Sequence, residues 1–508
     1  MKQPSPKPNI LCFVMDQLRA DHLGCYGNPD VKTPNIDRLA ERGVRCDQSF
    51  VANPVCMPNR ASMFTGQYPQ AHGLRYNGFT LPPSRVTLPE VLRQNGYQTA
   101  SIGKIHISAG AHEISNPELK DPIQQYESQQ YWQKNDSMPL PYYGLDHVYL
   151  VDGHGDYVYG HYKNELDREH PGMSEKLLPQ NASYTPGDHL RDFKHGCWEQ
   201  SIPVEHHYNT VIADKTINYL DQRDEDKPFF LWCSFPDPHH PYTTPAPYSR
   251  MYDPQKILYS PKRRDGELED LPPYMKEMVE GTSREMPWSY QDSDENFRTM
   301  IAYTYGMISF VDDCIGRIMN HLEQSGLAEN TIVVFLSDHG DMLADHGLNQ
   351  KGPYLFESLV RVPTIWHYPD SVQSNQSSNA VVSTVDLCPT LLDFAGVKIP
   401  GCVQGRSYRP VLSNETSEHR AWAYIEFDNP AYTAQRQIRS KEWAMTYDLR
   451  GESGMLFDLK NDPNELYNLW DDPVSATKKQ ELLILLLKQA SAASDNWEDR
   501  TYGWREFV

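Results

Sequence analysis

The sequence has no long apolar run, little basic charge and no regular cysteine pattern, and each absence excludes a class of protein. No stretch of about 18 consecutive apolar residues occurs, so we expect no transmembrane helix and no membrane partner. Asp and Glu outnumber Lys and Arg by 68 to 47, giving a formal net charge of −21 that argues against non-specific nucleic-acid binding. The nine cysteines are irregularly spaced, which indicates mostly free thiols in a reducing compartment.

The remaining bulk properties are those of an ordinary globular protein. The 508 residues are 39% hydrophobic and 23% charged, and they suffice for a large domain plus a smaller one. The first residues, MKQPSPKPN, lack the apolar core of a secretory signal, so the sequence predicts a cytoplasmic location.

The most informative stretch is NPVCMPNRASMFTG, residues 53–66. Pro58 suits the first turn of a helix, and Gly66 can end that helix. Cys56 would then lie at a helix N-terminus close to Arg60, an environment that favours an anion or an activated nucleophile. The alternative is a buried core cysteine in front of an ordinary helix, since free cysteine is among the most buried residue types.

Two predicted strands end in metal-binding residue types. NILCFVM, residues 9–15, is a continuous apolar run of the kind found in strands buried on both faces of a parallel sheet, and Asp16 follows it. A second strand, 331–336, is followed by Asp338 and His339. Enzymes with such sheets place their sites at the carboxyl ends of the strands, and carboxylates are hard oxygen ligands. The alternative for Asp16 is a helix cap or turn residue.

Two further predicted strands end in groups that could bind an anion or move a proton. Strand 97–102 leads into Gly-Lys-Ile-His, and residues spaced i, i+2 on extended chain point the same way, so Lys104 and His106 could grip one tetrahedral oxyanion. Strand 227–235 leads into PDPHHP, where His239 is well placed as a general acid. A solvated strand end is the alternative for the first pair.

The pattern Cys56-x-Pro58-x-Arg60 followed by AS-x-x-TG resembles the signature of the type I sulfatases, in the alkaline-phosphatase-like superfamily. In that family the cysteine is oxidised by a formylglycine-generating enzyme to formylglycine, which acts as the nucleophile. The resemblance therefore implies that the chain hydrolyses a sulfate monoester of a sugar, aryl group or small alcohol. Its expected partner is a small-molecule or oligosaccharide sulfate ester.

The resemblance also implies a metal site and a ring of anion-binding groups. One divalent metal would be held by Asp16, Gln17, Cys56, Asp338 and His339, where Gln17 is the neutral variant of a second aspartate. Ca²⁺ is favoured by the carboxylates, and a histidine ligand is compatible with Mn²⁺. The sulfate would be surrounded by Arg60, Lys104, His106, His239 and Lys351, which offset charge on its oxygens in the transition state.

Two assignments within this resemblance leave a choice. The family element Pro-His-x-Pro selects His239 rather than His240. Asn77 lies at a place comparable to an asparagine that faces the substrate in related enzymes, but it also suits a turn before Gly78.

The expected architecture is α/β, with a large central, mostly parallel sheet flanked by helices. Residues 1–405 would form the catalytic domain, with loop insertions at about 107–206 and 242–296 around the site mouth. Residues 406–508 would form a small α+β domain on an antiparallel sheet. Strands are predicted at 421–427, 433–439, 442–448 and 454–459, with a helix at 481–489.

Two other functions remain open on the sequence. A phosphonate monoester or phosphodiester hydrolase would use the same residues. A non-catalytic binding protein on this fold is the second alternative, and the intact Cys56, Pro58 and Arg60 argue against it.

Overall fold

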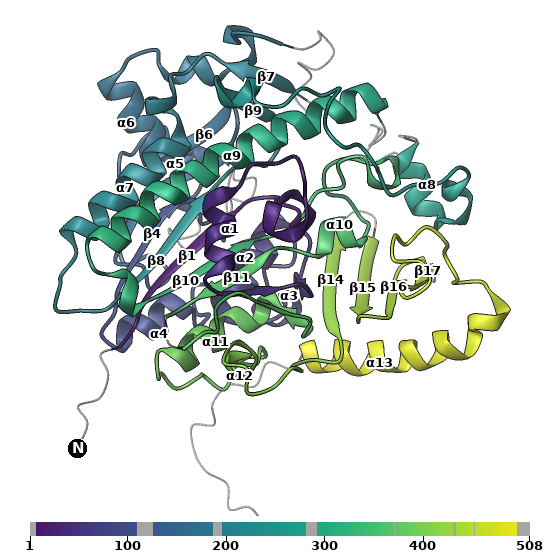
Figure 1. The fold of residues 1–508 in the computed structure, drawn as a ribbon. Helices are drawn as coiled ribbons and strands as arrows, with labels where there is room; N and C mark the ends of the chain where they lie inside the picture. The colour runs from purple at the N-terminus through teal and green to yellow at the C-terminus, as the bar shows by residue number, and fades with distance from the viewer. Residues whose placement is uncertain are drawn as a thin grey trace, which may run out of the picture.

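The computed structural model describes residues 7–108, 125–185, 196–280, 292–369, 371–429, 433–451 and 453–494. A nine-stranded sheet forms the centre of the molecule, and a four-stranded antiparallel sheet lies beside it (Figure 1). None of the described helices combines the length and the apolar character that a bilayer crossing requires.

The central sheet is mostly parallel, as the sequence predicts. Its core is formed by the parallel strands β10, β1, β8, β4 and β5, and antiparallel pairs join β11 to β10 and β6 to β5. In spatial order the strands are β12 (Gln376–Ser378), β2 (Val44–Cys46), β11 (Thr364–His367), β10 (Thr331–Ser337), β1 (Asn9–Met15), β8 (Phe229–Phe235), β4 (Gln98–Gly103), β5 (His147–His154) and β6 (Tyr157–Gly160).

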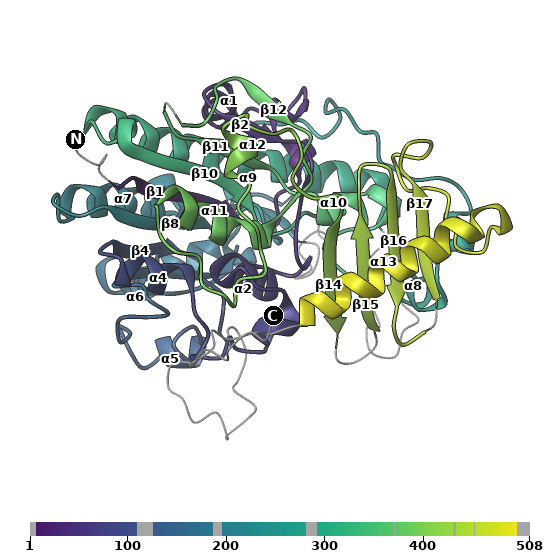
Figure 2. The same cartoon turned by 90° about the horizontal axis from the view of Figure 1, so that it is seen from below.

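Helices cover both faces of this sheet, which explains why its strands are apolar throughout (Figure 2). Alternate residues of β1, such as Phe13, pack with α1 (Pro34–Glu41), α6 (His161–Glu169), α7 (Tyr208–Gln222) and α9 (Asp294–Gln324). The intervening residues, such as Cys12, pack with α2 (Cys56–Thr65), α4 (Leu88–Gln94) and α11 (Leu387–Phe394).

Residues 107–206 are not only loop, so this part of the prediction is wrong. Strands β5 and β6 extend the central sheet, and the segment also forms α5 (Gln129–Trp132), α6 and β7 (Cys197–Gln200). Tyrosine supplies much of the buried surface here, which hides the aliphatic pattern of a strand. The second insertion contains β9 (Tyr242–Pro245) and α8 (Pro273–Val279). Residues 109–124, 186–195 and 281–291 lie outside the described residues.

The C-terminal sheet contains the four predicted strands in sequence order. They are β14 (Ala423–Asn429), β15 (Thr433–Arg439), β16 (Trp443–Asp448) and β17 (Ser453–Asp458). Helix α13 (Ala476–Ser494) is longer than predicted and packs on one face through Leu482 and Leu486. On β14, Phe427 belongs to the apolar cluster that holds Cys56. The boundary near residue 405 stays a prediction.

The remaining elements are short. They are β3 (Ser49–Phe50), paired with β13 (Val382–Ser383), and the helices α3 (Pro69–His72), α10 (Glu357–Val360) and α12 (Arg409–Leu412).

Candidate active site

Cys56 is the first residue of α2, as the Pro58 and Gly66 signals predict. Val55 is extended, and Gly66 ends the helix in the left-handed region with φ 65°. The Cys56 side chain is buried, and its Sγ lies 3.5 Å from Asn77 Nδ2 and 3.7 Å from Lys351 Nζ. Burial alone would raise the pKa of Cys56, but Lys351 and His106 lower it well below its usual value. Position 56 is therefore built to hold negative charge.

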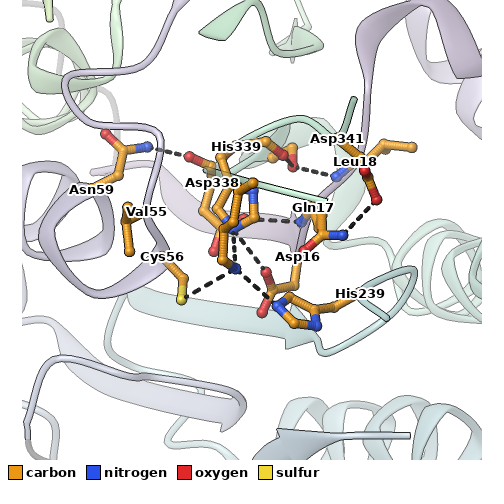
Figure 3. A network of polar contacts seen from close by, with 12 residues as sticks. Asp16, Gln17, Leu18, Val55, Cys56, Asn59, His239, Asp338, His339 and Asp341 are labelled. Atoms are coloured by element: carbon orange, nitrogen blue, oxygen red, sulfur yellow. Dashed lines mark hydrogen bonds and ion pairs between the residues drawn. The ribbon is translucent and has the colours of Figure 1, made fainter. Parts of the chain in front are cut away.

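Asp16, Asp338 and His339 form one buried cluster at the carboxyl ends of β1 and β10 (Figure 3). One ligand atom from each lies within 4.8 Å of the others, and His339 Nε2 is 3.4 Å from Asp16 Oδ1. The strands are parallel neighbours with Met15 opposite Ser337, so the residues that follow them meet. This register brings together the metal ligands that the sequence predicts.

The side-chain amide of Gln17, the residue after Asp16, is buried beside Asp341 and His240. Its Nε2 donates to Asp341 Oδ2 at 2.5 Å and lies 3.1 Å from His240 Nδ1. Its Oε1 is buried and makes no hydrogen bond with any described residue. A buried acceptor without a partner is costly. Two carboxylates, an imidazole and this oxygen form a donor set that fits a hard divalent cation.

Arg60 is buried against the carboxylates of the cluster. Its Nε donates to Asp338 Oδ2 at 2.7 Å, its Nη1 donates to Ser234 Oγ at 2.9 Å, and its Nη2 lies 3.7 Å from Asp16 Oδ2. These contacts give Arg60 a clear structural role. The expectation that Arg60 also lies against the bound sulfate stays a prediction.

Lys104 and His106 both reach the site, but the argument from extended chain is wrong for His106. Strand β4 ends at Gly103, and His106 has φ 59°. Lys104 Nζ donates to Asp16 Oδ2 at 2.5 Å, whereas a hydrogen bond with His106 helps to lower the pKa of Cys56. The turn after Gly103 therefore sends the two side chains to different parts of one site.

Lys351 joins the nucleophile position to two histidines. Its Nζ lies 2.8 Å from His239 Nε2 and 3.0 Å from His339 Nε2. His239 Nδ1 lies 2.6 Å from the His240 carbonyl oxygen. Burial, then the neighbouring His154 and Lys351, lower the pKa of His239 well below its usual value. Figure 3 shows the side chains of Cys56, His239 and His339 turned towards one another.

Sequence reasoning does not identify two residues that the structure places here. Asp341 follows Asp338-His339-Gly340 and binds the Gln17 amide. His154 ends β5, a strand that was not predicted, and its ring stacks on His239. A signal for His154 was available in the apolar run Val148–Val151 that precedes it, but the surrounding residues resemble a loop.

Two family models and several known proteins match most of the chain. The sulfatase family model matches residues 8–397, and the model of the N-sulphoglucosamine sulphohydrolase C-terminal region matches residues 344–492. The N-acetylglucosamine-6-O-sulfatase of Bacteroides thetaiotaomicron is 28% identical over 504 residues, covering 88% of this chain and 79% of that protein. The ulvan-active sulfatase of Formosa agariphila is 27% identical over 520 residues, covering 99% and 84%.

Solved structures of other proteins superpose on this chain over almost its whole length. The phosphonate monoester hydrolase of Agrobacterium radiobacter superposes with a TM-score of 0.81 at 25% identity, covering 96% of each chain. A protein solved in complex with its substrate D-glucosamine-2-N,6-O-disulfate superposes with a TM-score of 0.70 at 24% identity, covering 98% of this chain and 100% of that chain.

Proposed function

Because the chain belongs to the sulfatase family and is a sulfuric ester hydrolase, we propose that it cleaves a sulfate monoester of a carbohydrate with a formylglycine made from Cys56. One observation carries this proposal. Cys56 begins a helix and lies 3.7 Å from the Lys351 ammonium, which also contacts His239 and His339. The Lys351 ammonium is thus a common neighbour of the proposed nucleophile, the proposed proton donor and a proposed metal ligand.

The metal would be held by Asp16, Gln17, Asp338 and His339, together with the side chain at position 56. Bound there, the cation supplies Lewis-acid charge stabilisation to the sulfate oxygens. Ca²⁺ is our first choice because the donors are mainly hard oxygens, and the imidazole also suits Mn²⁺.

Formylglycine at position 56 would supply a hydrated aldehyde, whose first hydroxyl attacks sulfur and whose second hydroxyl later expels sulfate. Its formation breaks the C–S bond of Cys56, forms a C=O bond with oxygen from water and releases the sulfur as sulfide, while the oxidising co-substrate of the formylglycine-generating enzyme accepts the two electrons. Lys104, Lys351 and His106 would bind the sulfate oxygens and offset their growing charge. Binding of the sulfate anion would favour the protonated His239 imidazole, which would then give a proton to the departing alcohol oxygen.

A carbohydrate is the preferred leaving group because of the relatives. The relatives from Bacteroides thetaiotaomicron and Formosa agariphila are named for activity on N-acetylglucosamine-6-O-sulfate and on ulvan. Their similarity spans 88% and 99% of this chain. A sulfated mono- or oligosaccharide is therefore the first substrate class to screen.

The test begins with the mass of the peptide that carries residue 56, after co-expression with a formylglycine-generating enzyme. We expect an aldehyde at residue 56 and release of inorganic sulfate from a panel of sulfated sugars. Cys56→Ala should abolish turnover, whereas Cys314→Ala, at a buried cysteine of α9, should keep it. An aldehyde-bearing protein that releases no sulfate from sugar or aryl sulfates would refute the proposal.

A second candidate, phosphonate monoester hydrolysis, is favoured by the structural comparison. The phosphonate monoester hydrolases of Agrobacterium radiobacter and Silicibacter pomeroyi superpose with TM-scores of 0.81 and 0.79, above the 0.70 of the glucosamine-disulfate complex. The kcat/KM ratio for an aryl sulfate and the matched aryl phosphonate decides between the two activities. A higher kcat/KM for the aryl phosphonate would assign the chain to the phosphonate monoester hydrolases.

A further inference from the structure

His154 lies where two anion-binding elements of the site meet. Its imidazole stacks on the ring of His239, with ring centroids 3.6 Å apart and planes inclined by 8°. Its Nε2 lies 2.5 Å from Lys104 Nζ and 3.7 Å from Asp16 Oδ2. One side chain from β5 therefore contacts groups that follow β4 and β8.

Two glycines flank His154, and their backbone conformations place its ring against Lys104 and His239. Gly153 and Gly155 both have positive φ, 85° and 55°. A Cβ at Gly153 would lie 1.7 Å from the Tyr157 carbonyl oxygen, and one at Gly155 would lie 2.6 Å from Pro241 Cγ. Larger residues are thus excluded on both sides, because the β5–β6 turn passes against its own hairpin and against the segment that follows His239 and His240.

The contact with Lys104 fixes the direction of its ammonium group. An ammonium has three donors and no acceptor, and Lys104 directs one donor to Asp16 Oδ2 at 2.5 Å. His154 Nε2 receives a second donor as a neutral imidazole. Without that acceptor, Lys104 would be held by Asp16 alone on a flexible side chain.

Stacking against His154 also restrains the ring of His239. Both ring nitrogens of His239 are already engaged, Nδ1 with the His240 carbonyl oxygen at 2.6 Å and Nε2 with Lys351 Nζ at 2.8 Å. These contacts hold the ring by its edges, and His154 supports its face. The His154 side chain is 22% exposed, so it is not a fully buried core residue whose loss would collapse the fold.

We propose that His154 is a positioning residue for the sulfatase reaction, which holds the Lys104 ammonium and the His239 ring in the geometry that receives the sulfate ester. The inference rests on the proposed function, because it assigns Lys104 to the sulfate oxygens and His239 to the leaving alcohol.

Two variants separate the two contacts. His154→Phe keeps an aromatic face for His239 but offers Lys104 no acceptor. His154→Gln offers an acceptor at a similar reach but no ring. His147→Phe is the matched control, because His147 lies on the same strand as His154, also packs against an aromatic ring, that of Tyr219, and makes no described contact with Lys104 or His239.

Kinetics on protein with a verified aldehyde at residue 56 give the first readout. For His154→Phe we expect KM to rise by about tenfold, since one charge-assisted hydrogen bond is lost from the group that orients the anion. For His154→Gln we expect kcat to fall by up to about 10²-fold, and more for alkyl than for nitrophenyl sulfates, since misplacing a proton donor matters most for a poor leaving group. His147→Phe should change neither constant by more than about twofold.

Crystal structures and inorganic sulfate titrations of the same proteins give a readout that needs no turnover. We expect Lys104 to move in His154→Phe, with weaker sulfate binding, and the His239 ring to rotate in His154→Gln. The inference is overturned if both side chains keep their positions and both variants match His147→Phe in kcat, KM and sulfate affinity. A wild-type protein that binds sulfate but cleaves no sulfate ester would refute the proposed function, while the structures and titrations would still decide the role of His154.

Discussion

The site residues carry their charges in buried, mutually dependent pairs. Arg60 donates to Asp338 and lies near Asp16, so its charge offsets that of the two clustered carboxylates. Burial alone would lower the pKa of Arg60, but Asp338 and Asp16 raise it above its usual value. In this arrangement a residue that the sequence assigns to catalysis also holds the site together.

We expect Arg60→Met to lower the free energy of unfolding by about 3–5 kcal/mol, because it leaves buried carboxylates without their partner. Arg60→Lys should cost less, since it keeps the charge and loses only the planar fork. Chemical denaturation of the metal-free proteins measures both. Arg168→Met, at an exposed arginine, should stay within about 0.5 kcal/mol of wild type. If Arg60→Met and Arg168→Met lowered the free energy of unfolding equally, the ion pairs of Arg60 would not stabilise the fold as predicted.

Metal removal gives a second prediction at this scale. Adding Ca²⁺ at 100 times its Kd to chelator-treated protein should stabilise the fold by about 2.7 kcal/mol, seen as a rise in melting temperature. Asp338→Asn should abolish this rise, because it removes one of the clustered carboxylates. Asp386→Asn is the control, since Asp386 is an equally buried carboxylate paired with Arg420 outside the cluster. A rise that persists in Asp338→Asn would argue against the assigned ligands.

Among the secondary-structure elements, β15 supports the segment that follows Lys351. Gln435 Nε2 donates to the Pro353 carbonyl oxygen at 2.6 Å, and Gln437 Nε2 donates to the Leu355 carbonyl oxygen at 2.7 Å. Both glutamine side chains are buried. The C-terminal sheet thus reaches the active site through the backbone of this segment.

Gln435→Leu should therefore lower stability by about 1–3 kcal/mol, because the Pro353 carbonyl oxygen loses its buried donor. It should also raise KM, since the Lys351 segment loses an anchor. Gln376→Leu, at an exposed position of β12, serves as the control for both measurements. Loss of stability without any change in KM would limit β15 to a structural role.

Across the whole molecule, Glu357 joins α10 of the catalytic part to the C-terminal sheet. It accepts from Arg361 Nε at 2.7 Å and from Arg439 Nη2 at 3.0 Å, and Arg439 lies on β15. Burial alone would raise the pKa of Glu357, but Arg361 and Arg439 lower it from 4.5 to about 2. The carboxylate is thus stabilised in the folded state.

This shift predicts a pH dependence of stability. Since the pKa of Glu357 is lower in the folded state, its contribution of about 3 kcal/mol is complete above pH 4.5 and is lost as the pH falls towards 2. The difference in unfolding free energy between wild type and Glu357→Gln should shrink over that range. A difference that stays constant between pH 6 and pH 3 would show that Glu357 is not the group concerned.

Much of the site could be predicted because its residues follow strands with a strong pattern. Asp16 and Asp338 come after continuous apolar runs, and neighbouring parallel strands bring their ends together. His154 and Asp341 could not be found this way. The first ends a strand rich in tyrosine and histidine, and the second is placed by contacts with the Gln17 amide and the Tyr242 hydroxyl, which lie far from it in the sequence.

The sequence by itself determined the family, the mostly parallel sheet and the helix that begins at Cys56, because apolar runs, Pro58 and Gly66 act locally. Only the tertiary structure decided which side chains meet. A turn with φ 59° at His106, the glycines around His154 and the register of β15 are set by packing between distant segments. Such contacts depend on the assembled fold, so no local pattern of residues encodes them.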